Sequence, residues 1–147
     1  MFMRAIFVVF MLLLTAWPGG ARACSGGRIT LEERFNGIPT IFYARIVELE
    51  RPAPVPPELI GRPVIQIPPR GRFELIEVLK GDPPLDKWMR DHPSSCGVGL
   101  KPSAYYIFFT YSDPAVSSWA AGSRRYEGPD DPELLLMLAK LRALSGR

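Results

Sequence analysis

Proline divides this chain into short segments, and that spacing restricts the fold more than any other feature of the sequence. The 147 residues include 16 prolines and 13 glycines, and proline continues neither a helix interior nor a central strand. These residues argue against a bundle of long helices, and we expect one domain with many turns. With 47% apolar and 22% charged residues, the chain has the composition of a globular domain and not of a disordered one.

The first 23 residues are typical of a cleaved signal peptide. Arg4 provides a positive start, residues 5–14 form an apolar run, and Ala21-Arg22-Ala23 fits the A-x-A cleavage pattern. A membrane-spanning helix needs about 20 apolar residues, so this run is too short. We therefore expect residues 1–23 to be removed and residues 24–147 to form one exported domain without a membrane span. Its location would be secreted or periplasmic.

Cleavage after Ala23 makes Cys24 the first residue of the mature protein. Cys24 and Cys96 are the only cysteines, and two cysteines outside the cytosol usually pair, so we expect a disulfide between them. A lipoprotein signal also ends just before a cysteine, which leaves an alternative open: a lipid-anchored structural or envelope-interaction domain with Cys24 acylated and Cys96 unpaired. The residues Ala-Arg-Ala before Cys24 fit such a signal poorly.

Apolar and β-branched segments separated by proline and glycine turns predict five short strands. These segments are residues 40–50, 63–67, 71–80, 87–90 and 104–111. We expect the side chains of 71–80 to alternate regularly between two faces, and the very apolar segment 104–111 to run through the core. Five short strands in an exported domain indicate a β-barrel, with an OB-type Greek key as one option.

Helices are predicted at both ends of this set of strands. Thr30 and the acidic residues after it predict a short helix over 30–36. Asp131-Pro132-Glu133 is a typical start for a second helix. The apolar stripe of that helix consists of Leu134, Leu138 and Leu141. We expect the C-terminal helix to cover an open part of the barrel.

The charge balance argues against a nucleic-acid partner. Two of the 18 basic residues, Arg4 and Arg22, lie in the leader, which leaves 16 against 15 acidic residues. One histidine and two cysteines do not supply a zinc site by themselves, so no intrinsic metal or cofactor is expected. The segment Arg124-Arg125-Tyr126 could contact an acidic or carbohydrate ligand, but we interpret it as a solvated turn.

Catalysis is not expected from the sequence. The segment Asp91-His92-Pro93-Ser94-Ser95 contains residue types found in hydrolases, but triads are assembled in space, and sequence neighbours rarely face one another productively. We expect His92 to be a solvated loop residue. The prediction is therefore a non-enzymatic protein with no catalytic residue, and an enzyme that uses His92 is a remote alternative.

A set of features in a fixed order carries a family resemblance. They are Cys24-Ser25 at the mature start, LEERFNGIPTIFYARIVELE, RFELIEVLKGDPP, Ser95-Cys96-Gly97-Val98, AYYIFFTYSDP and the terminal helix. Together they resemble the N-terminal domain of the tissue inhibitors of metalloproteinases, within the netrin-like superfamily, in a single-domain form of bacterial type. The resemblance spans nearly all of residues 24–147. It implies a mainly β fold, a five-stranded OB-fold Greek-key barrel with a short N-terminal helix and a C-terminal helix.

The resemblance also implies a way of acting. In the family inhibitors the α-amine and carbonyl of the first cysteine chelate the zinc of the protease, and the next side chain enters its specificity pocket; here these residues would be Cys24 and Ser25. The resemblance implies the same Cys24–Cys96 disulfide. A catalytic zinc keeps an open position, and an α-amine, with a pKa of about 8, is partly neutral at pH 7. We expect a monomeric protein-binding module whose partner is a zinc metalloprotease or another exported protein.

Gly26 departs from the pattern of this family. The inhibitors usually have C-x-C at the mature start, whereas Gly26 replaces the second cysteine here, so only one family disulfide can form. Gly27-Arg28 stands where a proline often follows, which makes this segment more flexible. Because a flexible edge loses more entropy on docking, this departure weakens the expectation of inhibition.

Overall fold

The strand β1 (Thr40–Leu49) is the centre of the fold, because it pairs along both of its edges. The computed structural model describes residues 29–50, 56, 67–111 and 116–146. Beside β1 lie β2 (Arg70–Lys80) and β4 (Tyr105–Thr110), both antiparallel to it. The predicted leader and the residues Cys24, Ser25 and Gly26 lie outside the described residues.

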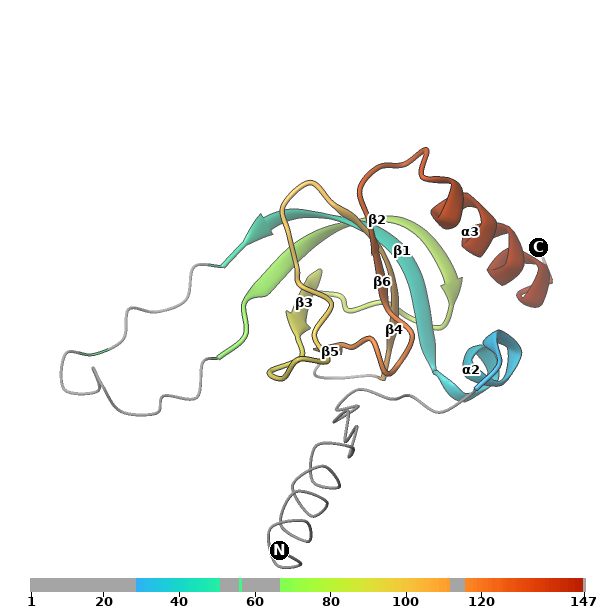
Figure 1. Cartoon of the computed structure of the whole chain (residues 1–147), viewed down its shortest axis with the longest axis horizontal. Coiled ribbons are helices and arrows are strands. Elements are labelled where there is room, and N and C mark those ends of the chain that lie inside the picture. The colour runs from blue at the N-terminus through green and yellow to red at the C-terminus, as the bar shows by residue number, and fades with distance from the viewer. Residues whose placement is uncertain (1–28, 51–55, 57–66, 112–115, 147) are drawn as a thin grey trace, which may run out of the picture.

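Three shorter strands extend this sheet on its two sides. β3 (Trp88–Asp91) pairs antiparallel with β2, and β5 (Val116–Ser117) pairs parallel with β3. On the other side β6 (Arg124–Tyr126) pairs antiparallel with β4. The order is β5-β3-β2-β1-β4-β6, and this mixed sheet curls into a half-barrel (Figure 1). The fold is therefore mainly β, as the sequence predicted.

The two faces of β1 belong to two different hydrophobic clusters. Ile41 and Tyr43 pack with residues from both helices, because side chains on a strand alternate between its faces. Phe42 lies in the second cluster, with its ring centroid 5.0 Å from that of Phe73 on β2 and 5.3 Å from that of Phe108 on β4. Burial on both faces explains why β1 is a nearly continuous apolar run.

The N-terminal helix α2 (Leu31–Gly37) begins as the sequence predicted. The hydroxyl of Thr30 accepts a hydrogen bond from the backbone N–H of Glu33 at 3.1 Å, and the carboxylate of Glu33 accepts one from the Thr30 N–H at 2.8 Å. This reciprocal capping box satisfies two backbone donors at the helix start. The buried side chain of Phe35 attaches the helix to the first cluster.

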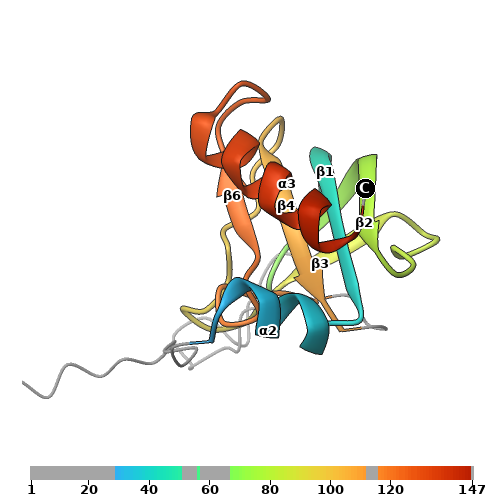
Figure 2. The ribbon, with the colours of Figure 1, turned by 90° about the vertical axis from the view of Figure 1, so that its right-hand side faces the viewer.

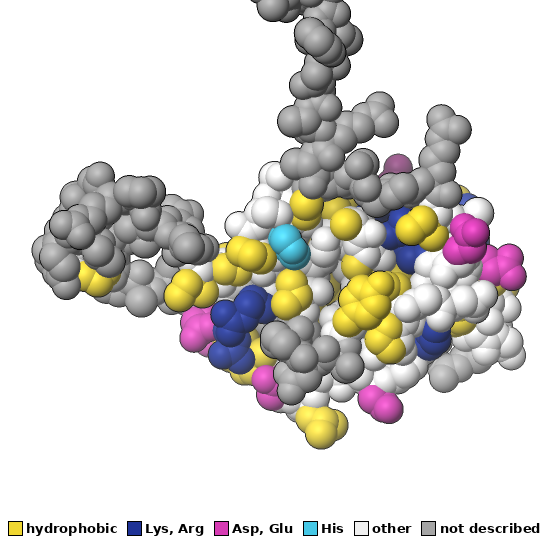
Figure 3. Space-filling model, turned by 90° about the horizontal axis from the view of Figure 1, so that it is seen from below, with side chains coloured by type: hydrophobic (Ala, Val, Ile, Leu, Met, Phe, Trp, Pro, Cys, Tyr) yellow, Lys and Arg dark blue, Asp and Glu magenta, His cyan; other side chains and the backbone are white. Residues whose placement is uncertain are grey.

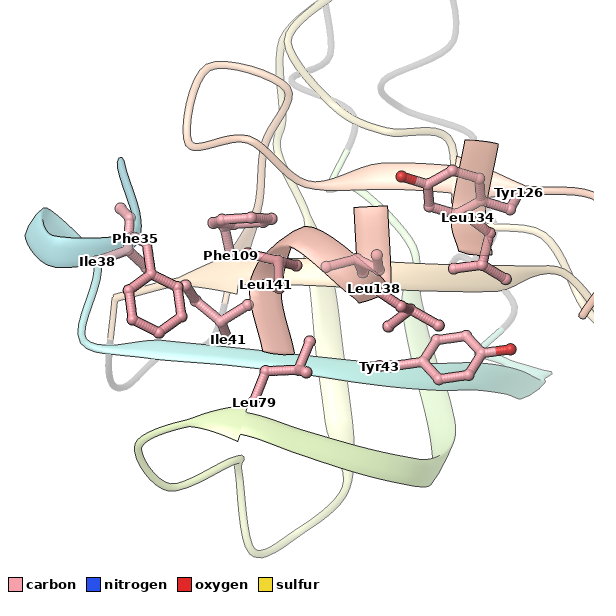
Figure 4. Packing of buried hydrophobic residues seen from close by; sticks show 11 residues of the cluster. Phe35, Ile38, Ile41, Tyr43, Leu79, Phe109, Tyr126, Leu134, Leu138 and Leu141 are labelled. Atoms are coloured by element: carbon pink, nitrogen blue, oxygen red, sulfur yellow. The ribbon is translucent and has the colours of Figure 1, made fainter. Parts of the chain in front are cut away.

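The C-terminal helix α3 (Pro132–Leu144) also confirms its prediction. The carboxylate of Asp131 accepts hydrogen bonds from the backbone of the first turn, and Pro132 occupies the first helical position. Leu134, Leu138 and Leu141 are all buried and point toward the sheet (Figure 4). Both helices lie over the same face of the sheet (Figure 2). Among the described residues, no helix is long and apolar enough to cross a membrane.

The count of five strands and one turn assignment need correction. The structure has six described strands, and β5 and β6 are not among the five predicted ones. Arg124-Arg125-Tyr126 is not a solvated turn: it forms β6, and Tyr126 is buried in the first cluster. Strands of two or three residues with serine and arginine show no apolar alternation, so a pattern search passes over them.

The strand expected at 63–67 is mostly outside the described residues, and the alternation expected along 71–80 is only partly right. Most of the strand expected at 63–67 lies outside the described residues; Ile67 is described, belongs to no strand and is 72% exposed. The regular alternation expected for 71–80 is wrong in its middle, where Leu75 and Ile76 are both exposed. There Ala44 pairs with Leu75 and Tyr43 with Glu77, so Ile76 is an additional residue that interrupts the alternation.

Candidate functional site

The segment that follows β3 carries Cys96 and is the candidate functional site. We call residues 92–101 the Cys96 loop. It contains all of Ser95-Cys96-Gly97-Val98, one of the pieces that carry the sequence resemblance. Figure 3 shows the molecule from below, where His92 of this loop, the one histidine of the sequence, lies among several hydrophobic side chains.

The buried carboxylate of Asp91, the last residue of β3, organises this loop. It is 6% exposed. It accepts hydrogen bonds from the backbone N–H groups of His92 (2.9 Å), Val98 (2.9 Å), Gly99 (2.9 Å) and Leu100 (3.2 Å), and from the hydroxyl of Ser117 (3.0 Å). Burying a carboxylate is costly unless its oxygens are satisfied, and hydrogen bonds to a carboxylate are stronger than neutral ones. The loop is therefore wrapped around one acceptor.

Gly97 allows the loop to pass close to Asp91. A Cβ at this position would lie 2.9 Å from the Oδ1 atom of Asp91 and 2.9 Å from the carbonyl oxygen of His92. The next residue, Val98, is buried in the second hydrophobic cluster. Position 97 needs glycine because there is no room for a Cβ, and position 98 needs an apolar side chain because it is buried. These two constraints give a physical reason for Gly97-Val98 after Cys96.

The hydroxyl of Tyr106 on β4 holds the other end of the loop. It donates a hydrogen bond to the Gly99 carbonyl at 3.1 Å and accepts one from the Lys101 N–H at 2.8 Å. Burial raises the pKa of Tyr106 to about 12. The guanidinium group of Arg125 also donates to the Gly99 carbonyl, at 3.2 Å. Both ends of the loop are therefore attached to the sheet.

Cys96 lies between these two attachments and is half-buried. Its backbone N–H donates to the Ser94 hydroxyl at 3.2 Å, and its carbonyl accepts from the Trp119 N–H at 2.9 Å. No cysteine is free in the part of the chain that the structure describes. Since Cys24 and Ser25 lie outside that part, the expected pairing and the expected role of Ser25 remain predictions.

His92 and Ser94 contact each other but do not have the geometry of a hydrolase triad. The Ser94 Oγ lies 2.9 Å from Nδ1 of His92, and the Ser94 N–H donates to the same nitrogen at 3.3 Å. In a triad the serine contacts the second ring nitrogen, and an aspartate accepts from Nδ1–H. Asp91 instead accepts from the backbone N–H of His92. These residues stabilise a turn, and the half-buried His92 is not fully solvated as the sequence analysis expected.

A second feature adjoins the Cys96 loop at the turn between β5 and β6. The guanidinium carbon of Arg124 lies 4.3 Å from the ring centroid of Trp119, and its Nη1 donates to the Trp119 carbonyl at 3.1 Å. From α2, Arg34 donates to the Ala120 carbonyl at 2.6 Å. Gly122 has a φ of +112°, and a Cβ there would lie 2.4 Å from Cδ of Arg34. Burial, and then the charge of Arg34, lower the pKa of Arg124.

Sequence reasoning missed Asp91 as the organiser and Trp119 as the neighbour of Cys96. Asp91 was noted only among hydrolase residue types. An aspartate before a proline-, serine- and glycine-rich segment is a signal for a side chain that accepts backbone N–H bonds in a turn. No local signal identifies Trp119 as a neighbour of Cys96, because the two residues lie 23 positions apart in the sequence (119 − 96) and only the fold brings them together.

Over residues 29–50, 67–111 and 116–146, no group of three or more His, Cys, Asp or Glu side chains lies together so that it could hold a metal ion.

No family model matches the chain, and comparison with curated proteins gives no match.

Proposed function

We propose that this protein is an exported, netrin-like binding module that inhibits a zinc metalloprotease through its mature N-terminus. The α-amine and carbonyl of Cys24 would bind the zinc of the partner, and Ser25 would enter the pocket beside it. The zinc belongs to the partner, and no cofactor of the module itself takes part. The module is a monomer and has no catalytic role of its own.

The topology supports an OB-type barrel for this module. β5 is parallel to β3, and β6 is antiparallel to β4. If β5 and β6 are the two halves of one interrupted strand, the strand count becomes five, and this strand joins the two outer sides of the curled sheet. The short N-terminal helix and the C-terminal helix then complete the architecture that the resemblance implies.

The observation that carries the proposal is the attachment of the Cys96 loop to Asp91. Five hydrogen bonds to one buried carboxylate, and the bond from Trp119 to the Cys96 carbonyl, hold the backbone around Cys96 in place. A disulfide from Cys24 to this position would hold the N-terminal amine against a rigid support. Preorganisation of this kind reduces the entropy lost on docking and offsets part of the flexibility that Gly26 introduces.

The first experiment measures the intact mass of the exported protein with and without reductant, together with a non-reducing peptide map. We expect the mass of residues 24–147 less two hydrogens, a peptide that joins Cys24 to Cys96, and a free α-amine. An acylated Cys24 or a blocked amine contradicts chelation by this residue. Acylation would support the lipid-anchored alternative instead.

The second experiment measures inhibition of a panel of zinc metalloproteases by the oxidised protein and by a variant with one alanine added before Cys24. The added residue moves the amine away from Cys24 and leaves the disulfide intact, so we expect it to abolish inhibition. One alanine added after Arg147 is the matched control. Equal inhibition by the wild type and by the N-terminally extended variant would rule out chelation by Cys24.

A further inference from the structure

Two arginines beside the Cys96 loop, Arg34 on α2 and Arg124 on β6, differ from most of the other arginines that the structure describes. Each of four other arginines has a carboxylate partner within 3.3 Å: Arg45 with Glu74, Arg72 with Glu48, Arg125 with Glu127 and Arg142 with Glu77. Arg34 and Arg124 have no carboxylate within ion-pair distance among the residues that the structure describes. Their positive charges are therefore left without a local counter-charge.

Neutral carbonyl groups hold both side chains in place. Nη1 of Arg34 donates to the Ala120 carbonyl, and Nη1 of Arg124 donates to the carbonyls of Trp119 and Ser123. A guanidinium group has five N–H donors. Over the described part of the chain, the Nε and Nη2 atoms of both residues donate to no acceptor. Oriented donors thus remain available on two adjacent cations.

Trp119 adds an apolar surface next to these donors. Its ring lies against the Arg124 guanidinium group. Trp119 nevertheless remains 41% exposed. Tryptophan and arginine are the residue types that most often dominate protein–protein binding energy. An exposed tryptophan with an unneutralised arginine pair fits a ligand that presents an oxyanion close to apolar atoms.

We propose that Arg34, Trp119 and Arg124 form a binding site for an acidic side chain on a partner protein. The planar carboxylate of Asp or Glu matches the two-donor fork of a guanidinium group, and the neighbouring apolar atoms of the partner would cover Trp119. A polyanion is less suitable, because nucleic acids and anionic membranes are bound through many cations. The exported chain has nearly balanced charge, and this site offers two cations.

The site adjoins the Cys96 loop, the part of the surface at which the proposed protease partner would dock. The Trp119 N–H donates to the Cys96 carbonyl at 2.9 Å, so the arginine pair adjoins the loop from which Cys24 would extend. This inference does not depend on zinc chelation, because it concerns different residues and a different chemistry. A partner could use it whether or not Cys24 binds a metal.

The test is an NMR titration of the oxidised ¹⁵N-labelled protein with acetyl-tetraglutamate amide, with acetyl-tetraglutamine amide as the neutral control. We expect saturable shifts of the Trp119 indole and backbone signals with the acidic peptide and none with the neutral one. The double variant Arg34→Gln/Arg124→Gln should bind about tenfold more weakly or not at all, because it removes both positive charges and the charge-assisted hydrogen bonds that they donate.

Matched controls separate this site from general charge effects. The variant Arg45→Gln/Arg72→Gln removes two positive charges from arginines that have carboxylate partners, and it should bind the peptide as the wild type does. Equal weakening in both double variants, or no saturable shift at Trp119 in the wild type, overturns the proposal. If sodium sulfate displaces the peptide far better than sodium chloride at equal ionic strength, the site binds a free oxyanion and the proposal is also wrong.

If the glutamine double variant does not fold, a lysine double variant tests the proposal instead. Arg34→Lys/Arg124→Lys keeps both charges and removes the planar fork. In that case, several-fold weaker peptide binding by the lysine variant supports the proposal, and unchanged binding contradicts it. No metalloprotease is used in any of these measurements, so their result is separate from that of the inhibition assay.

Discussion

The carboxylate of Asp91 on β3 lies 3.0 Å from the hydroxyl of Ser117 on β5, and both side chains are buried. β3 and β5 form the only parallel pair among the described strands, and the pair is two residues long. A ladder of that length offers few backbone hydrogen bonds. The bond between the two side chains therefore links the end of the sheet to the same carboxylate that holds the Cys96 loop.

Replacing Asp91 with asparagine tests this central role. The substitution keeps the shape but places an NH₂ group where an oxygen accepts backbone N–H bonds. Buried donors without acceptors cost free energy, so we expect the free energy of unfolding to fall by about 2–4 kcal/mol. Urea unfolding followed by circular dichroism measures it. Asp130→Asn, at an exposed position, should change stability by less than about 0.5 kcal/mol; a similarly small effect at Asp91 would show that the loop is held by other contacts.

Gly97→Ala tests whether space is the reason for glycine in the Cys96 loop. The new Cβ would meet the Asp91 carboxylate and the His92 carbonyl, each at 2.9 Å. We expect a loss of about 1–3 kcal/mol, typical of overpacking. Gly128→Ala is the control, since nothing lies within 4 Å of its Cβ, and it should be neutral or slightly stabilising. Thermal unfolding of the two variants under identical conditions gives the comparison, and equal melting temperatures would contradict the steric argument.

Stability should decrease at alkaline pH because of two buried tyrosines. Burial raises the pKa of Tyr106 and of Tyr126 to about 12, whereas an unfolded tyrosine has a pKa of about 10. Folding thus favours the neutral phenol: the contribution is complete below about pH 10 and is lost as the pH rises to about 12. Urea unfolding at several pH values in this window should show a shallower decline for Tyr106→Phe than for the wild type. Tyr111→Phe, at a residue that is 62% exposed, should leave the decline unchanged.

The packing of α3 gives a prediction independent of the functional site. Leu138 is 3% exposed and lies in the cluster between α3 and the sheet. Leu138→Ala removes buried apolar volume and should cost about 2–4 kcal/mol. Leu136→Ala, on the same helix but 58% exposed, should cost less than about 0.5 kcal/mol. Denaturant midpoints for both variants check this difference, and an equal shift would mean that α3 is not anchored by its leucine stripe.

Much of the fold could be predicted from short stretches of sequence. The capping residues Thr30 and Asp131 mark the starts of the two helices, and both act on backbone groups within three residues of themselves. The strands β1 and β4 are apolar enough to be recognised without their partners. β5 and β6 were missed because two or three residues form a strand only when a neighbouring strand supplies the hydrogen bonds.

The candidate site was predicted less completely than the fold. Cys96 and the Ser-Cys-Gly-Val segment were identified from the sequence, but the residues that hold them were not. Asp91 contacts Ser117 across 26 positions, and Arg34 contacts Ala120 across 86. Contacts at such separations leave no periodic pattern for local analysis to detect.

The sequence by itself determined the helix starts, the apolar strands β1 and β4 and the stripe of leucines on α3, because each depends on the chemistry of neighbouring residues along the chain. Only the tertiary structure decided that Asp91 holds the Cys96 loop and that Arg34, Trp119 and Arg124 meet beside it. Those arrangements depend on the curl of the sheet, which brings β3, β5 and β6 and the helix α2 together. Burial and hydrogen bonding between distant segments then select which polar residues are enclosed and which remain available for a partner.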